Sequence, residues 1–489
     1  MIARPLRHAI LIAVLICGVA QAPADPVGRA ATPPRPAIAD TVTHHTLVLP
    51  GRTLRFTATA GAIRLQTDSG VPRSDIAFIA YQQEDADPRT RKVTFVMNGG
   101  PGFASGWLNV GAVGPWRIPF NGGPSASPVL MPNAETWLDF TDLVFIDPAD
   151  TGLSRILGNE EEGRKQFFSV EGDIGSLAAA IRLWLDQAQR NASPKYLLGE
   201  SYGGFRGPRL ARALASEQGT GLSGLILLSP LLDFGGRSEV FDPFAYAVRL
   251  PTMAAVARKA TTRADVADVE HYAVNGFLVD ATAGERNPAA IERRTARVAG
   301  FVGLPLDVVA RYRGLIGIGD FARILNQATG RVTSLYDATV SIPDPYPEET
   351  RSHYPDPILD GLQAPVASAM VTLYETELNV RHEGTYRLQS PMAFKFWDWG
   401  HRQQGGAQSL DAMRQALALD PRLHVLIAHG LYDLVTPYFA TQILLDQIPA
   451  ASGGDRVRLV VYPGGHMFYS QDVSRAAFRA EAKKLIDAE

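Results

Sequence analysis

Four short motifs in this 489-residue sequence carry residue types that can perform acyl transfer. The GESYGG motif at 199–204 places Ser201 in a GxSxG frame, after the apolar run YLL and before a helical pattern that begins near Phe205. This context predicts a nucleophile elbow, in which a sharp strand-to-helix turn exposes the serine hydroxyl. The alternative is a structural turn serine, because GxSxG alone is a weak signal in a Gly-rich chain. The other three motifs are NGGPG at 98–102, GLYD at 430–433 and GGH at 464–466.

A serine hydroxyl becomes a good nucleophile only when a base removes its proton, so a histidine must approach Ser201 from elsewhere. Of the ten histidines, His466 follows the last apolar run, in a Gly-Gly turn that could project it over the serine. Hydrolases of this architecture carry nucleophile, acid and base in that chain order, and Asp433 fits the acid. The alternative for Asp433 is that it caps the next helix.

The NGGPG motif follows the apolar run VTFVM and could supply hydrogen-bond donors for the charge that develops on a substrate carbonyl. Gly99 and Gly100 have no side chain to obstruct their amides. We expect one of these N–H groups and that of Tyr202 to form an oxyanion hole. The alternative is a plain turn.

The remaining pattern indicates the elements that must hold these motifs. Residues 43–81 alternate between apolar and polar types, which predicts antiparallel strands. Beyond Arg91, short apolar runs are separated by helix-like segments, which is typical of strands buried on both faces of a mostly parallel sheet. The sequence therefore predicts an α/β fold with helices on both faces of its sheet and catalytic groups at the carboxyl ends of its strands.

The predicted organisation is a signal peptide at 1–24, a flexible lead-in at 25–42 and a core in two parts, 43–234 and 396–489. Between them, at 235–395, the strand pattern fails and amphipathic segments take over. We interpret this insertion as a helical cap over the active site, with a separate second domain as the alternative.

The first residues read as a secretory signal, because Arg4 and Arg7 precede an apolar run at 10–20 that is too short to span a membrane. The protein is therefore expected to be secreted or periplasmic, without a stable membrane anchor after cleavage; an uncleaved anchor is the alternative. The single cysteine, Cys17, lies in this run, so the mature protein would have no disulfide and no thiolate metal site.

Composition excludes some partners and leaves others open. With 47 basic and 50 acidic residues the net charge is -3, which makes nucleic acid an unsuitable ligand. No motif indicates a metal or a nucleotide, so no cofactor is expected. The sequence gives no indication of oligomeric state.

Taken together, the motifs resemble those of the serine carboxypeptidase family, whose members have the α/β-hydrolase fold with a helical insertion. NGGPG, FIDPADTGLSR at 145–155, GESYGG, the GLYD segment and GGHMFY at 464–469 resemble family blocks in the right order. The resemblance implies Ser201, Asp433 and His466 as the catalytic triad, with the amides of Gly100 and Tyr202 as the oxyanion hole.

The resemblance further implies that Asn98, the Gly99 amide and Glu200 hold the free carboxylate of a peptide substrate. A glutamate donates a hydrogen bond only when it is protonated, so Glu200 would need a raised pKa or an acidic medium. The alternative for Glu200 is a structural hydrogen bond behind the elbow.

Two departures from the family pattern stand in the stretch after NGGPG. Many members carry a second glutamate where this chain has Ala112 or its neighbours, and Phe103 replaces a frequent cysteine. The predicted function is a serine-type carboxypeptidase that works through an acyl-enzyme on peptides with a free C-terminus. Its alternatives are an esterase or acyltransferase on the same scaffold, and a non-catalytic peptide-binding protein.

Overall fold

The computed structural model describes residues 38–120, 127–234, 242–349, 354–382, 384–400 and 407–488. The chain divides into Met1–Arg35 and Pro36–Glu489, and the fold below is that of the second unit. The predicted signal peptide and residues 25–37 of the predicted lead-in lie outside the described residues. The end of the predicted lead-in is ordered earlier than expected, because the first strand begins at Thr41. Within the described ranges, no helix combines the length and apolar content needed to span a bilayer.

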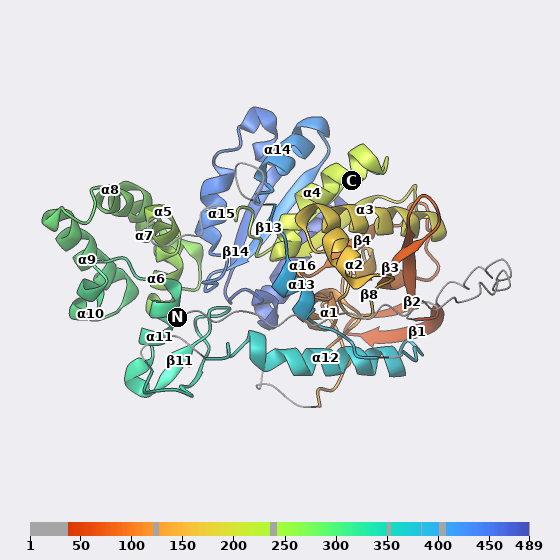
Figure 1. Cartoon of the computed structure of the whole chain (residues 1–489), viewed down its shortest axis with the longest axis horizontal. Helices are drawn as coiled ribbons and strands as arrows, with labels where there is room; N and C mark the ends of the chain where they lie inside the picture. The colour runs from red at the N-terminus through yellow and green to blue at the C-terminus, as the bar shows by residue number, and fades with distance from the viewer. Residues whose placement is uncertain are drawn as a thin grey trace, which may run out of the picture. The chain divides into compact units, whose positions relative to one another are not determined.

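A ten-stranded sheet forms the centre of the described chain, with the order β1-β2-β3-β7-β4-β9-β10-β13-β14 and β8 beside β3 (Figure 1). The strands from β7 to β14 in this order pair in parallel, whereas β1, β2 and β3 pair antiparallel, and β3 also pairs antiparallel with β7 and β8. The predicted α/β class is confirmed. The strands are β1 (Thr41–Leu49), β2 (Arg52–Gln66), β3 (Pro72–Gln83), β4 (Val93–Met97), β5 (Trp116–Arg117), β6 (Met131–Pro132), β7 (Asp142–Ile146), β8 (Arg155–Ile156), β9 (Lys195–Glu200), β10 (Gly224–Leu228), β11 (Arg331–Thr333), β12 (Ser341–Pro343), β13 (His424–Gly430) and β14 (Val457–Tyr462).

Both faces of the parallel strands are buried, which explains their uninterrupted apolar runs. Along β9, Leu197 belongs to one hydrophobic cluster and Leu198 to another, because successive side chains of a strand point to opposite faces. Helices α3 (Val170–Gln187), α4 (Tyr202–Glu217) and α14 (Leu410–Leu419) contribute to the first cluster. Helices α12 (Leu359–Thr376) and α16 (Asp472–Asp487) contribute to the second.

The chain between β10 and β13 contains two kinds of structure. Its first part forms a separate hydrophobic cluster from residues between Ala247 and Ala338. Four residues that follow β13 complete this cluster, namely Leu431, Leu434, Tyr438 and Phe439. Its helices are α5 (Pro243–Ala247), α6 (Leu250–Arg258), η2 (Arg263–Val266), α7 (Ala267–Tyr272), η3 (Ala273–Phe277), α8 (Leu278–Thr282), α9 (Pro288–Val302), α10 (Leu306–Arg311), α11 (Ile318–Ile324) and η4 (Gln327–Thr329), followed by the β11–β12 pair.

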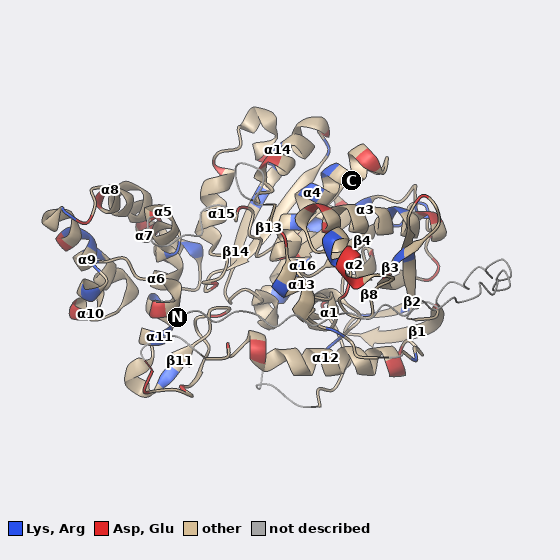
Figure 2. Cartoon of the chain, in the orientation of Figure 1, with Lys and Arg blue, Asp and Glu red and all other residues tan. Residues whose placement is uncertain are grey.

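Helix α12 differs from those helices because it packs into the core of the sheet. Leu362, Val366 and Leu373 are buried in the same cluster as strand residues of β1 and β2. The helix lies beside β1, where the Thr41 hydroxyl donates to the carbonyl of Leu378 at 2.9 Å (Figure 1). Its ribbon carries charge near its ends and none along the middle, and one face of the helix is buried (Figure 2). Part of the segment predicted as a cap thus belongs to the hydrophobic core of the sheet.

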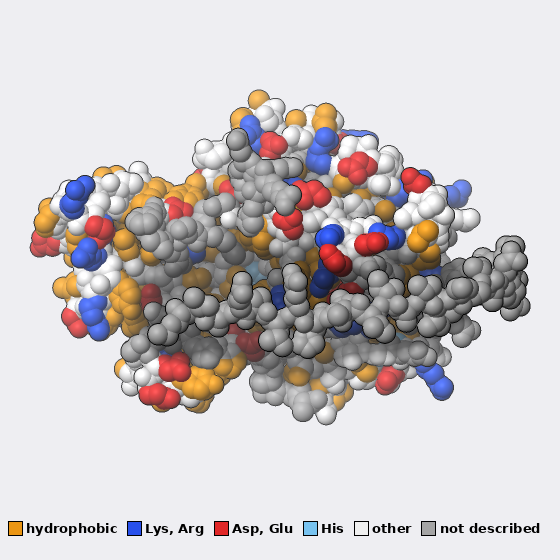
Figure 3. Space-filling model, viewed as in Figure 1, with side chains coloured by type: hydrophobic (Ala, Val, Ile, Leu, Met, Phe, Trp, Pro, Cys, Tyr) orange, Lys and Arg blue, Asp and Glu red, His pale blue; other side chains and the backbone are white. Residues whose placement is uncertain are grey.

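The remaining helices connect the strands or follow the last one. They are α1 (Gly106–Leu108), η1 (Asn109–Val113), α2 (Glu160–Phe167), α13 (Pro391–Phe396), α15 (Tyr438–Leu445), η5 (Ala450–Ser452), η6 (Gly454–Arg456) and η7 (Phe468–Ser470). On the face seen in Figure 3, basic and acidic side chains are intermixed and apolar side chains gather over part of the insertion. Within the insertion, Val279 of α8 and Leu306 of α10 are 61% and 58% exposed.

Candidate active site

Ser201 stands at the junction of β9 and α4, in a backbone conformation that ordinary residues rarely adopt. Its φ and ψ are 59° and -119°, and its amide donates to the carbonyl of Leu228 at 2.8 Å. The turn closes tightly because a Cβ at Gly199 would lie 2.1 Å from the carbonyl oxygen of Gly203. Such strain persists where the surrounding structure enforces it, and it commonly marks functional residues. Helix α4 begins at Tyr202, three residues before the predicted start.

Asp433 and His466 come together at the carboxyl ends of the last two strands. The distance between His466 Nδ1 and Asp433 Oδ2 is 2.7 Å, and both side chains are buried. Ser201 and His466 line the same pocket. The structure therefore brings the three side chains of the predicted triad to one end of the sheet.

The carboxylate of Asp433 is held by donors on both of its oxygens. Oδ1 accepts from the amides of Val435 at 2.8 Å and Thr436 at 3.0 Å, so Asp433 does cap the turn that follows it. Oδ2 accepts from the Thr436 hydroxyl at 2.6 Å as well as facing His466. The helix that follows, α15, begins at Tyr438 and has no side-chain cap, so Asp433 closes the turn before this helix and does not cap the helix itself. Its other oxygen, Oδ2, faces His466.

The electrostatics of the pair favour a charged carboxylate beside the imidazole. Burial opposes the protonated form of His466, but the charge and hydrogen bond of Asp433 and the charge of Glu200 outweigh it and raise the pKa of His466. Burial likewise opposes ionisation of Asp433, but its interactions with His466 and Thr436 hold the pKa of Asp433 below its usual value. A base oriented in this way is able to accept a proton from a nucleophile and stabilise the resulting charge.

A segment of the insertion packs directly against both loops that carry this pair. The His466 amide donates to the carbonyl of Tyr336 at 2.5 Å, and the Leu434 amide donates to that of Leu335 at 3.1 Å. The Tyr336 ring meets the His466 ring edge-on, with centroids 5.3 Å apart. The insertion therefore contacts His466 and the loop that follows Asp433, and Tyr336 also borders the pocket.

The NGGPG loop packs against the elbow by close backbone approach. A Cβ at Gly99 would lie 2.5 Å from the amide nitrogen of Tyr202 and 2.6 Å from the carbonyl oxygen of Glu200. Gly100 has φ +108°, which side chains disfavour. The amide of Tyr202 is the first of α4, and the first N–H groups of a helix have no intrahelical partner. Of the two predicted oxyanion-hole residues, Tyr202 directly follows Ser201 and Gly100 lines the same pocket as Ser201.

Asn98 and Glu200 form a buried hydrogen-bonded pair at the floor of the pocket. Asn98 Nδ2 donates to Glu200 Oε2, and Asn98 Oδ1 accepts from the Leu108 amide at 3.0 Å, which fixes the orientation of the amide group. Glu200 is 3% exposed. Burial raises the pKa of Glu200 to about 7; the charge of His466 and hydrogen bonds from Tyr469 and Asn98 lower it, while Asp433 raises it. The protonated, hydrogen-bond-donating form is therefore accessible near neutral pH.

The pocket above these groups has a volume of about 270 Å³. Aromatic side chains of Phe103, Trp107 and Phe394 form part of its wall, together with Gln363 and Gln389. Its further lining residues are Asn98, Gly99, Gly100, Glu200, Ser201, Tyr336, Leu359, Asp360, His466 and Met467. All five residues predicted to act in catalysis or in carboxylate binding through a side chain lie here or, for Asp433, directly behind His466.

The two departures from the family pattern have clear positions. Ala112 is buried in η1, within the main hydrophobic cluster, so this position offers no acid to the pocket. Phe103 replaces the frequent cysteine with part of the pocket wall. Tyr469, Thr436 and Tyr336 are the neighbours of the site that sequence reasoning missed.

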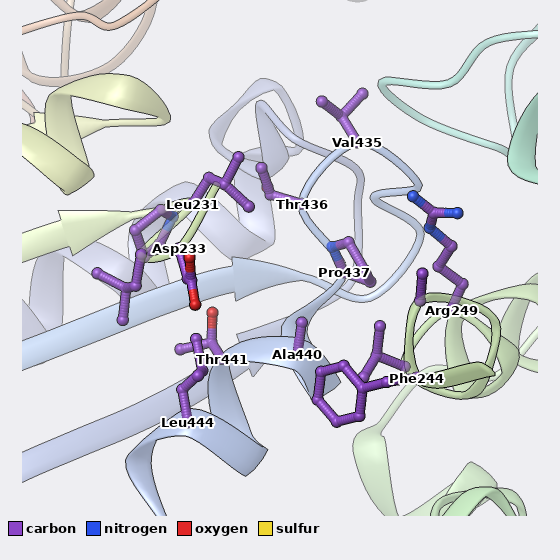
Figure 4. A pocket seen from close by; sticks show the side chains of 14 residues that line it. Leu231, Asp233, Phe244, Arg249, Val435, Thr436, Pro437, Ala440, Thr441 and Leu444 are labelled. Carbon is purple, nitrogen blue, oxygen red and sulfur yellow. The ribbon is translucent and has the colours of Figure 1, made fainter. Parts of the chain in front are cut away.

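A second pocket of about 170 Å³ is lined in part by the residues that follow Asp433 (Figure 4). Figure 4 shows Val435, Thr436 and Pro437 on one side and Phe244 and Arg249 of the insertion on another. Thr436, which contacts Asp433, is the point where this pocket approaches the site. Neither Ser201 nor His466 borders it, whereas both line the first pocket.

Among the described histidines, His466 is the one that lines the pocket with Ser201. His429 is buried, bonds to the Thr441 hydroxyl at 2.9 Å, and has its pKa lowered to about 4 by burial. No cluster of three or more His, Cys, Asp or Glu side chains suited to a metal occurs in the described part of the chain. His8, His353 and His401 lie outside the described residues.

Comparison with known proteins agrees with the motifs and the fold. Residues 50–273 match the model of a family described as serine carboxypeptidase. This confirms the resemblance drawn from the sequence and identifies the chain as an enzyme of the serine carboxypeptidase type. A search of curated proteins found no match.

Solved structures share the fold at low sequence identity. The crystal structure of Kex1Δp, a prohormone-processing carboxypeptidase from Saccharomyces cerevisiae, is 15% identical, with 87% of this chain and 91% of that chain covered and a TM-score of 0.57. A proline iminopeptidase from Mycobacterium smegmatis is 15% identical, covers 91% and 98%, and has a TM-score of 0.37. A thermophilic esterase from Thermogutta terrifontis is 14% identical, covers 87% and 98%, and has a TM-score of 0.35. The α/β-hydrolase fold follows from the first of these and from the sheet order.

Proposed function

Because residues 50–273 match serine carboxypeptidases, we propose that this serine peptidase removes residues from the free C-terminus of peptides through an acyl-enzyme. The observation that carries the proposal is the arrangement of one pocket, which has Ser201 and His466 at one point and the buried Asn98–Glu200 pair at another. A nucleophile with its base beside a carboxylate-binding group suits cleavage at a chain end. The leader pattern at 1–24 supports export of the enzyme.

In the proposed mechanism His466 takes the proton of the Ser201 hydroxyl as the oxygen attacks the carbonyl carbon of the last peptide bond. Asp433 stabilises the imidazolium that forms. The amides of Gly100 and Tyr202 donate to the oxyanion, and His466 then protonates the leaving amine. Water, activated by the same histidine, hydrolyses the ester on Ser201 and restores the enzyme.

Binding of the substrate carboxylate is assigned to Asn98, the Gly99 amide and protonated Glu200. The pKa of Glu200, raised to about 7 by burial, supports its role as a donor. A bound carboxylate would raise this pKa further, because a neighbouring negative charge disfavours a second one. Ala112 in place of a second acid leaves Glu200 as the single carboxyl assigned to this task.

The test compares blocked dipeptides that end in a free carboxylate with the matching amides and simple esters. Ser201→Ala should reduce turnover on the order of a millionfold, while Ser216→Ala, on the exposed part of the same helix, should have no effect. Equal cleavage of acids and amides would reject the exopeptidase assignment and retain the hydrolase. Turnover of esters alone would instead favour the esterase or acyltransferase alternative, and binding without turnover a peptide-binding protein.

A further inference from the structure

Tyr469 lies three residues after His466, in η7, and its backbone is fixed on both sides. Its carbonyl accepts from Arg475 Nη1 at 2.9 Å, and the Ser470 amide donates to the Met467 carbonyl at 2.8 Å. The Tyr469 ring is fully buried in the main hydrophobic cluster, with its centroid 6.3 Å from that of Phe120. Because the backbone and the ring of Tyr469 are both fixed, its hydroxyl has one defined position.

The hydroxyl of Tyr469 lies beside the carboxyl group of Glu200. The Tyr469 hydroxyl donates to Glu200 Oε2 at 3.3 Å, and Asn98 Nδ2 donates to the same oxygen. Glu200 Oε1 is also buried and has no hydrogen-bond partner among the described residues. The two oxygens of one carboxyl group are therefore in different environments, one with two donors and one with none.

This asymmetry decides where the proton of a neutral Glu200 resides. An oxygen that accepts two hydrogen bonds is the carbonyl-like oxygen of a carboxylic acid, because a proton on it would compete with those donors. The proton then belongs on Oε1. Since Glu200 lines the substrate pocket, Oε1–H is the group with which it can meet a ligand.

Tyr469 also contacts the segment in which the second acid of the family pattern is missing. A Cβ at Gly111 would lie 3.3 Å from Tyr469 Cε2, and Ala112 is buried in the same cluster. Burial and the charge of Glu200 raise the pKa of Tyr469 well above its usual value, so the phenol remains a donor at any working pH. A second carboxyl group would itself titrate with Glu200, whereas this phenol does not.

We propose that Tyr469 is a positioning residue which, together with Asn98, confines the proton of Glu200 to Oε1 and so lets a single carboxyl group donate to the terminal carboxylate of the substrate. This inference rests on the proposed function. In this chain the phenol of Tyr469 and the amide of Asn98 would support Glu200 in place of the second carboxylic acid that the family pattern contains. This inference also predicts that carboxylate binding follows the titration of one group.

Other charged and titratable groups face Glu200 and must be left in place by the test. They are His466 and Asp433 behind the serine, Tyr336 from the insertion and Asp360 on the pocket wall. Tyr469→Phe changes none of them and keeps the buried ring. Tyr196→Phe is the matched control, because Tyr196 is an equally buried tyrosine at the start of β9, the strand that ends at Glu200. Its hydroxyl donates to the Ile486 carbonyl at 3.2 Å instead of to Glu200.

The first measurement is the pH profile of kcat and KM on peptide acids and on the matching esters. In Tyr469→Phe the KM for acids below pH 6 should rise about 3- to 10-fold, as expected for loss of one hydrogen bond, with a much smaller change in kcat and in ester turnover at the same pH. The alkaline limb for acids should move to higher pH, because the lost hydrogen bond had stabilised ionised Glu200. Tyr196→Phe should reproduce the wild-type profiles.

The second measurement is an infrared titration of the Glu200 carboxyl group, assigned by its absence in Glu200→Gln. Its midpoint should rise in Tyr469→Phe and stay in place in Tyr196→Phe. This measurement requires no substrate, so it tests the role of Tyr469 separately from the carboxypeptidase proposal. If the wild-type enzyme cleaves acids and amides equally, the carboxypeptidase proposal is rejected, while the infrared result for Tyr469 still stands. An unmoved midpoint, or equal loss on acids and esters, would overturn the role of Tyr469.

Discussion

The ring of Tyr336 stands edge-on to the imidazole of His466, with centroids 5.3 Å apart and planes at 87°. The contact joins the insertion to the proposed catalytic base, since the Tyr336 carbonyl also accepts from the His466 amide. We expect Tyr336→Ala to lower kcat about tenfold on acids and esters alike, because an edge-on aromatic contact contributes about 0.5–1.5 kcal/mol. Steady-state kinetics with both substrate types measures the loss.

Tyr336→Phe keeps the ring and serves as the matched variant. It should retain nearly all of the wild-type kcat, and thermal unfolding of both variants would report any general loss of structure. If alanine and phenylalanine behave alike, the ring contact has no part in positioning His466.

The sequence predicted the triad residues around His466 but not the side chains that contact them. Strand patterns and the GxSxG frame are local signals, so the α/β class and the strands that precede Ser201 and Asp433 could be predicted. Tyr336 reaches His466 from the insertion, and no local pattern records which side chain of a long insertion will meet a loop far along the chain. Tyr469 lies in the GGHMFY motif, but its hydrogen bond to Glu200 depends on tertiary packing and could not be predicted from the motif.

Thr436 was within reach of sequence reasoning, because it stands three residues after Asp433. An aspartate often accepts from the amides two and three residues ahead, and Asp433 does so with Val435 and Thr436. The hydroxyl bond from Thr436 to Oδ2 is the part that could not be predicted, since it depends on the rotamer of both side chains. The missing second acid near Ala112 was predicted, whereas the phenol beside Glu200 was not.

Thr436→Val is expected to weaken the support of the proposed acid. The variant keeps the side-chain volume but removes a 2.6 Å hydrogen bond from a buried carboxylate, which is typically worth about 1.5–3 kcal/mol. We expect kcat to fall roughly tenfold or more. The pKa of Asp433 should rise, because the Thr436 hydroxyl helps to hold it down.

The control for this variant is Thr441→Val. Thr441 is buried nearby and its hydroxyl bonds to His429, which lies outside the proposed triad. Urea unfolding and ester kinetics on both variants separate stability from catalysis. Loss of activity in Thr441→Val but not in Thr436→Val would contradict the assignment.

The pH dependence should differ between peptide acids and esters. His466 must be neutral to accept a proton, and its pKa is raised above 6.5, so ester turnover should increase with pH through that raised value. Peptide acids additionally require protonated Glu200, whose pKa is about 7, so their kcat/KM should fall again at higher pH and give a bell-shaped profile. Because the two groups interact, the limbs report the pair rather than either residue.

Glu200→Gln checks this interpretation through esters alone. The charge of Glu200 raises the pKa of His466, so its removal should shift the ester limb to lower pH. Asp360→Asn removes a charge from the same pocket wall and is the control, with an expected limb unchanged from wild type. Equal shifts in the two variants would mean that general pocket charge, rather than Glu200, sets the pKa of His466.

A buried ion pair supports the elbow from below. Arg206 Nε and Nη2 donate to the two oxygens of Asp173 at 2.7 and 3.2 Å, and Arg206 Nη1 donates to the Asn98 carbonyl at 2.7 Å. Arg206 is fully buried and Asp173 is 4% exposed. Arg206→Met should lower the free energy of unfolding by about 3–5 kcal/mol, because it leaves a buried carboxylate without its partner.

The double variant Arg206→Met, Asp173→Leu should recover most of this stability, since replacing both charges by apolar groups removes the unpaired charge. Its activity on peptide acids should remain low, because the Asn98 carbonyl loses its donor and the Asn98–Glu200 pair loses a support. Arg55→Met, which breaks the exposed pair with Asp85, is the control and should change neither quantity. Full recovery of both stability and acid turnover in the double variant would show that Arg206 acts on the fold alone.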